Sequence, residues 1–266
     1  MLRVYACITE DHDLRLVIVA GLLCAMATFA AMSLRVRAAE AARIGVRLRW
    51  LTAAAVVTGC GVWSTHFVAM IAFKPSLPIG YDIGLTILSI GVAIVIAGSG
   101  IGLALYRPRL AALGGAVVGV GVGSMHFVGM AAMRVQAIVH WDAGYVMASL
   151  AIGIAFGAAA LAVASRQPTL KGRVIAGLLL TLGICGLHFT AMAAASLEPD
   201  PGIPLPDLMI PPNALALVIA AVTILIIGLA LTGSMVDSHL SARNAAEARR
   251  LRQHVADLEA MKRELE

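Results

Sequence analysis

The chain has 266 residues, of which 60% are hydrophobic and only 13% are charged. Soluble domains usually carry about 25% charged residues, so this depletion argues against a soluble fold. The net charge of +5 reflects a surplus of Lys and Arg. That surplus is explained by the basic loops of a membrane protein, and no nucleic-acid partner is expected.

Seven stretches are apolar over the length of about 20 residues that a bilayer crossing requires. They are residues 14–34, 50–73, 83–106, 110–133, 144–164, 174–197 and 213–236. Lipid leaves no room for unpaired backbone groups, so each stretch should be a helix. We therefore expect an all-α, multi-pass protein in which seven transmembrane helices form one membrane domain over residues 8–236.

The distribution of Lys and Arg predicts how these helices are oriented, because cytoplasmic loops are enriched in basic residues. Most of them fall after spans 1, 3 and 5 and in the C-terminal segment, for example Arg35, Arg107, Lys171 and Arg249. The N-terminus should then lie outside and the C-terminus in the cytoplasm. Spans 2, 4 and 6 should run outward across a bacterial cytoplasmic membrane.

Spans 2, 4 and 6 share the motif His-Phe-x-x-Met, which begins at His66, His126 and His188. The three histidines are separated by 60 and 62 residues, and each should lie at the same depth, about 10 Å inside the outer boundary. We expect three two-helix repeats of the same orientation, followed by a seventh helix. A parallel threefold arrangement would bring the three histidines into one layer.

Residues four apart share one face of a helix, so each motif presents an imidazole and a thioether together. Thioether sulfur favours copper(I), and imidazole accepts copper in either oxidation state. Intramembrane histidines are costly and are usually functional. The predicted copper ligands are His66, Met70, His126, Met130, His188 and Met192.

Other residues could assist such a site. Each odd span begins with a ring-bearing residue and an aspartate, in the pairs His12-Asp13, Tyr81-Asp82 and Trp141-Asp142. The aspartates suit helix N-caps, and Tyr81 and Trp141 suit the interfacial aromatic belt. Alternatively, Asp13, Asp82 and Asp142 orient the imidazoles by accepting their free N–H groups. Met125, next to His126, and Cys185, three residues before His188, are further auxiliary candidates.

These motifs resemble the MHYT domain, a family of bacterial membrane sensors with seven spans and a Met-His-Tyr-Thr-like motif on three of them. The resemblance covers nearly the whole chain. It implies a copper site near the outer face, sensing of a diatomic gas such as oxygen, carbon monoxide or nitric oxide, and a cytoplasmic output domain. The name motif is only partly kept, since Met precedes His only at Met125 and Phe67, Phe127 and Phe189 replace the tyrosine.

Residues 237–266 are polar, and Leu251, Leu258 and Leu265 recur every seven residues. This short heptad pattern predicts a cytoplasmic signalling helix that pairs with a second copy in a parallel homodimer. A solvated amphipathic helix is the alternative. Because no catalytic module follows, we expect either a longer parent protein or a chain that works through a partner.

Three functions fit the sequence, and none of them makes this chain an enzyme. The first is a membrane sensory input module that detects a diatomic gas or a redox state through copper and relays to an output domain. The second is a copper transporter or channel, although a pathway needs polar groups at several depths. The third is a haem-binding redox protein, since three histidines at one depth could support an axial pair.

Overall fold

The computed structural model describes residues 2–206, 208–229, 232, 250 and 253. Its helices are α1 (Leu2–Thr9), α2 (Leu14–Glu40), α3 (Ile44–Ala72), α4 (Ile83–Tyr106), α5 (Ala111–Ala132), α6 (Ala143–Arg166) and α7 (Leu170–Met192), with a short 3-10 turn η1 at Pro108–Leu110. A further helix covers Pro212–Leu229. Four short strands lie between helices: β1 (Gly80–Tyr81), β2 (Met133–Arg134), β3 (Ala137–Trp141) and β4 (Ala195–Pro199).

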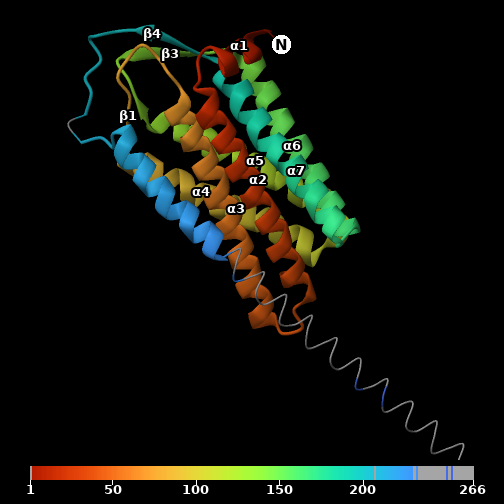
Figure 1. Ribbon diagram of the computed structural model, residues 1–266. Coiled ribbons are helices and arrows are strands. Elements are labelled where there is room, and N and C mark those ends of the chain that lie inside the picture. The colour runs from red at the N-terminus through yellow and green to blue at the C-terminus, as the bar shows by residue number, and fades with distance from the viewer. Residues whose placement is uncertain (1, 207, 230–231, 233–249, 251–252, 254–266) are drawn as a thin grey trace, which may run out of the picture.

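Seven helices among the described residues are long and apolar enough to cross a membrane, which confirms the predicted number of spans. Helices α2 to α7 form one bundle, with the helix over Pro212–Leu229 beside α3 and α4 (Figure 1). The strands and α1 lie together at one end of this bundle. The chain is a multi-pass membrane protein.

Most observed helices agree closely with the expected spans, but the span predicted over 174–197 is wrong at its end. Helix α7 stops at Met192, and Ala195–Pro199 forms strand β4, whose backbone pairs antiparallel with β3. Hydropathy could not mark this boundary because small apolar residues run on through Ala193 to Ala195. Residues 230–231 and 233–236 of the seventh expected span, and nearly all of the predicted signalling helix, lie outside the described residues.

The same backbone contact closes each of three consecutive helix pairs at this end of the bundle. The amide of Asp13 donates to Ala72 O at 2.9 Å, that of Asp82 to Ala132 O at 2.8 Å and that of Asp142 to Ala194 O at 2.9 Å. The preceding ring residues pair with Phe73, Met133 and Ala195, each seven positions after a motif histidine. Each motif helix is thus tied to the helix before it with one recurring register.

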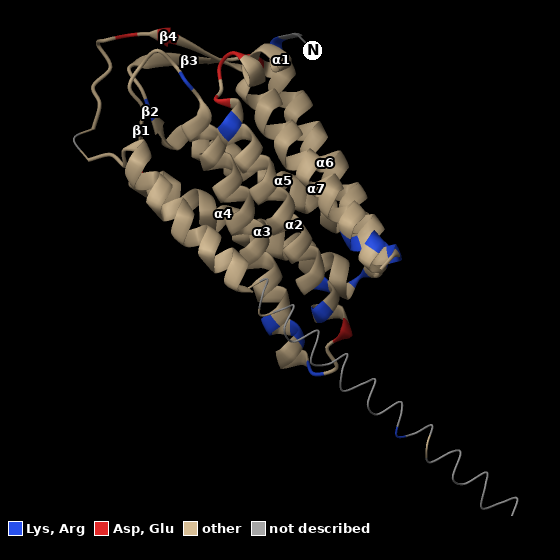
Figure 2. Ribbon diagram, in the orientation of Figure 1, with Lys and Arg blue, Asp and Glu red and all other residues tan. Residues whose placement is uncertain are grey.

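Charged residues are segregated along the bundle. Lys and Arg gather at the end away from the strands, whereas acidic residues are mostly at the end that carries them (Figure 2). This segregation is consistent with an orientation in which the strands lie outside the cell. The orientation itself stays a prediction.

Candidate metal centre

The three motif histidines meet inside the bundle. His66 lies on α3, His126 on α5 and His188 on α7, and each is at least 96% buried, with exposures of 2%, 1% and 4%. Their nearest ring nitrogens all lie within 4.8 Å of one another. The three imidazoles lie in one layer, as expected, and within that layer they also come together in a single cluster.

The Nδ1 atoms face the centre of this cluster. His66 Nδ1 lies 3.2 Å from His126 Nδ1 and 3.3 Å from His188 Nδ1. The ring planes are nearly perpendicular, at 84°, 74° and 89° to one another. Each imidazole nitrogen has a single in-plane lone pair or proton, so His66 Nδ1 cannot satisfy two partners by hydrogen bonding. A single electrophile that accepts the lone pairs of all three Nδ1 atoms would satisfy them together, which hydrogen bonding cannot do.

The spacing suits a metal ion. Ligand nitrogens about 2.0 Å from a tetrahedral ion are about 3.3 Å from each other. The distances from His66 Nδ1 to the other two Nδ1 atoms, 3.2 and 3.3 Å, are close to this value. The opposite ring nitrogens, Nε2 of all three histidines, are buried and have no hydrogen-bond partner among the described residues. The polar atoms that are brought together are therefore the Nδ1 set.

Close packing holds the imidazoles in place. A Cβ added at Gly129 on α5 would collide with His66 Nε2, so the imidazole occupies the space that this glycine leaves. Each histidine also packs edge-on against the phenylalanine that follows it, with centroids 4.8, 5.1 and 5.0 Å apart. The orientation of the rings is thus fixed from two sides.

The motif phenylalanines make a second ring of contacts that closes on itself. Phe67 packs on Tyr81 at 5.5 Å, Phe127 on Trp141 at 5.6 Å and Phe189 on His12 at 5.4 Å. Each phenylalanine therefore contacts the ring residue that begins the next odd helix, and the last contacts the first. These aromatic pairs cover the imidazoles on the side that carries the strands.

This arrangement changes the interpretation of two residues. Tyr81 is 1% exposed, so it is not part of an interfacial belt. His12 is also buried, at 3%, and its Nδ1 lies 2.7 Å from Cys7 O, so this nitrogen carries the proton. Burial lowers the pKa of His12. Among the features of the sequence, only the recurring register could have indicated the burial of His12.

The aspartates act as helix caps. Asp13 accepts from Arg15 N, Asp82 from Leu85 N and Asp142 from Gly144 N and Tyr145 N. Their remaining described contacts are with basic groups, namely Lys74 at 3.0 Å, Arg134 at 2.9 Å and Arg3 at 3.5 Å. The Leu85 amide and the Arg134 guanidinium lower the pKa of the Asp82 carboxyl. Among the described residues, no hydrogen bond or ion pair joins these three carboxylates to an imidazole.

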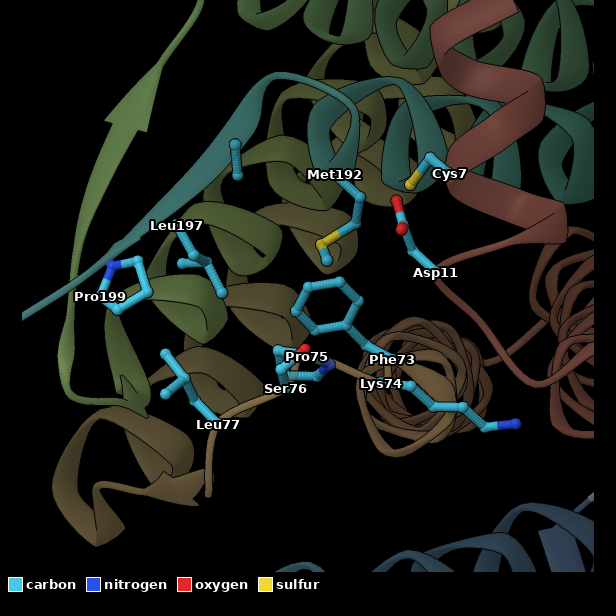
Figure 3. A pocket seen from close by; sticks show the side chains of 11 residues that line it. Cys7, Asp11, Phe73, Lys74, Pro75, Ser76, Leu77, Met192, Leu197 and Pro199 are labelled. Atoms are coloured by element: carbon cyan, nitrogen blue, oxygen red, sulfur yellow. The ribbon is translucent and has the colours of Figure 1, made fainter.

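The motif methionines are buried but do not share one point. Each lines a different cavity: Met70 one of about 280 Å³, Met130 one of about 410 Å³ and Met192 one of about 310 Å³. Figure 3 shows Met192 and Phe73 at the third cavity, which Cys7 and Asp11 also line. Met125 is 1% exposed within the core, and Cys185 contacts Cys24 on α2.

Comparison with known proteins identifies the chain. A family model described as the MHYT bacterial signalling protein N terminal repeat matches residues 59–116 and 119–177. The chain belongs to the MHYT family. Each matched segment begins in a motif helix, α3 or α5, and extends through the helix after it, so two of the three histidines fall within the matched repeats.

MHYT relatives are signalling proteins. The chain is 35% identical over 251 residues to an uncharacterized signaling protein of Caulobacter vibrioides, covering 94% of this chain and 31% of that protein. It is 35% identical over 210 residues to the bifunctional diguanylate cyclase/cyclic di-GMP phosphodiesterase MucR of Pseudomonas aeruginosa, covering 76% and 30% respectively. The chain thus spans about a third of the length of these relatives. No solved structure matches it.

Proposed function

We propose that His66, His126 and His188 bind one copper ion, and that this MHYT domain is the sensory input module of a signalling protein in the bacterial cytoplasmic membrane. The observation that carries the proposal is the convergence of three buried imidazoles, with His66 Nδ1 3.2 Å from His126 Nδ1 and 3.3 Å from His188 Nδ1. When bound, copper would supply a Lewis-acid centre with affinity for a small diatomic ligand. The protein's residues would set its geometry and exclude water.

Charge favours copper(I) over zinc. The three imidazoles are neutral ligands, and no carboxylate is among the residues that form the cluster. The cost of burying an ion rises with the square of its charge, so a divalent ion costs about four times as much as a monovalent one of the same size. The thioethers of Met70, Met130 and Met192 would offer soft donors for copper(I) in the cavities further out.

Contacts from the centre lead toward the seventh helix. His66 packs on Phe67, Phe67 on Tyr81, and Tyr81 pairs through its backbone with Ile210 at 3.0 and 2.9 Å. Ile210 lies two residues before Pro212, where the next helix begins. We propose that a change in the position of the His66 ring reaches this helix through Tyr81, and from there a cytoplasmic output domain.

Two alternatives are less well supported. A haem with two axial imidazoles needs its porphyrin plane between them, whereas these nitrogens face one point at close range. A copper channel needs an open path inward, yet Gly115 and Gly119 on α5 are packed so closely on α6 that an added Cβ would strike the carbonyls of Gly157 and Gly153. Copper uptake into sealed vesicles containing the protein would nevertheless favour transport.

The test is metal loading followed by ligand binding. The purified protein is reconstituted anaerobically with copper(I) in competition with a chelator of known affinity, and carbon monoxide is then added. We expect about one copper per chain and an infrared band for metal-bound carbon monoxide. Absence of copper binding would overturn the metal site, and copper without a carbon monoxide band would overturn the gas-sensing part alone.

A further inference from the structure

The seam between α2 and α7 is the place where the first and last helices of the six-helix bundle meet. Thr28 on α2 and Thr181 on α7 face each other across it, with their hydroxyl oxygens 2.9 Å apart. Nearer the strand-bearing end, His12 lies against Phe189, so the two helices run antiparallel.

This register places two cysteines opposite each other. One helical turn before Thr28 is Cys24, and one turn after Thr181 is Cys185. In an antiparallel pair, moving one turn back on one helix and one turn forward on the other keeps the side chains facing. The thiols of Cys24 and Cys185 are indeed in contact, and the Thr65 and Thr181 hydroxyls lie beside Cys24.

The matching seams in the other two repeats carry different residues. By the recurring register, the positions of Thr181 and Thr28 correspond to Gly59 and Ala97 between α3 and α4. Between α5 and α6 they correspond to Gly119 and Gly157, where backbones pack tightly. The closing seam therefore has hydroxyls where the other two seams have glycine or alanine. At the positions of Cys185 and Cys24 the other seams have Trp63 with Ala93 and Gly123 with Gly153, so neither of them carries a pair of thiols.

We propose that Cys24 and Cys185 form a reversible disulfide that locks α2 to α7 beside the histidine cluster. Both cysteines are free in this structure. The oxidant would be a lipid-soluble quinone, reaching the pair from the side of Cys185, which is only partly buried. Two S–H bonds break and one S–S bond forms, and the two electrons and two protons convert the quinone to a quinol.

The disulfide would act on the centre because of its position. Cys185 is three residues before His188 on α7, a rise of about 4.5 Å. A covalent link from α2 at this level would fix α7, and with it the His188 imidazole, relative to the rest of the bundle. The domain would then respond to the redox state of the membrane quinones independently of any ligand at the three histidines.

Oxidation of the purified full chain with a water-insoluble quinone analogue tests this inference, with diamide as a second oxidant and dithiothreitol for reversal. After unfolding and alkylation, we expect two of the four cysteines to escape labelling. Peptide mapping should recover a Cys24–Cys185 cross-linked peptide that disappears on reduction. The double variant Cys7→Ala/Cys60→Ala should still lose both remaining thiols, whereas Cys24→Ser or Cys185→Ser in that background should keep the single thiol.

Complete labelling of all four cysteines in the oxidised wild-type chain would overturn the inference. So would a cross-link that joins Cys7 or Cys60, or one between two chains. If the variants fail to fold, mapping of the wild-type chain decides the question alone. Because no metal is added, a negative result here leaves the proposed copper site unaffected, and a failed copper experiment leaves the disulfide unaffected.

Discussion

His66 and His126 hold their Nδ1 atoms 3.2 Å apart at the centre of the bundle, and the one further described partner of His66 Nδ1 is the Nδ1 of His188. Two imidazoles at this distance share one hydrogen bond at most, and His188 adds a third nitrogen that competes for the same space. Such a cluster is best satisfied when one ion takes all three lone pairs. This relationship makes the histidines, and the side chains that hold them, the first targets for mutation.

Replacing one histidine should abolish tight metal binding. His126→Ala removes one of three ligands, and we expect the affinity for copper(I) to fall by about 100-fold or more. Chelator competition on the purified protein measures the loss. His140→Ala is the matched control, because His140 is exposed and its Nε2 lies 2.8 Å from the Glu198 carboxylate, so it does not belong to the cluster. Equal copper affinity in the two variants would argue against a site at the three histidines.

The glycine against His66 should also matter. Gly129→Ala places a methyl group where the His66 imidazole now lies, so the ring must shift or the helices must separate. Overpacking of this kind typically costs about 1–3 kcal/mol. We expect a lower thermal midpoint and at least about tenfold weaker copper binding, measured by unfolding in detergent and by chelator competition.

Gly91→Ala on α4 is the control for that substitution, because nothing lies within 4 Å of its added Cβ. It should leave copper binding unchanged and could raise helix stability slightly, since alanine has the higher helix propensity. If Gly129→Ala behaves like Gly91→Ala, the imidazole is not held by the space at Gly129.

Much of this fold could be predicted from the sequence because lipid imposes a simple rule. Uninterrupted apolar stretches must be helices, and the spans at 83–106 and 110–133 lie within about one or two residues of α4 and α5 and their flanking turn. The caps at Asp13, Asp82 and Asp142 were also predictable, since short-range chemistry decides them. The strands were missed because their pairing joins residues far apart in the chain.

The site was only partly predictable for a related reason. Helical periodicity puts His66 and Met70 on one face, but it cannot say whether both reach the same neighbour. In the structure the imidazoles converge, whereas each thioether lines a cavity of its own. The role of Phe67, Phe127 and Phe189 also depends on contacts with the following repeat, which the motif alone does not reveal.

Acid should weaken the end of the bundle that carries the strands. Asp82 caps α4 and binds Arg134, and these contacts lower the pKa of its carboxyl from the ordinary value of 3.8. A carboxyl with a depressed folded-state pKa stabilises the fold above its ordinary pKa, and that contribution is lost as the pH falls below it. We expect the thermal midpoint of the metal-free protein to fall as the pH drops from about 5 to about 3.

Asp82→Asn isolates that contribution. It should lower the midpoint at neutral pH, because the contact with Arg134 loses its charge, and it should flatten the decline in acid. Circular dichroism melts across the pH series measure both effects. An unchanged slope would mean that other carboxyls, such as Asp13 bonded to Lys74, dominate the acid response.

The contact of Tyr81 with Phe67 should carry the signal toward the seventh helix. Tyr81→Ala removes the ring that packs on Phe67 but keeps the backbone that pairs with Ile210, so the link is cut at one point. We expect copper affinity within about threefold of wild type, because Tyr81 is not a ligand, together with loss of the copper-dependent change in the helix at Pro212–Leu229. Hydrogen exchange of peptides from this helix, with and without copper, measures that change.

Trp141→Ala is the matched control, since Trp141 packs on Phe127 in the same way but pairs with Ala195 instead of Ile210. A copper-dependent change that survives Tyr81→Ala, or one lost equally in Trp141→Ala, would show that the signal leaves the centre by another route.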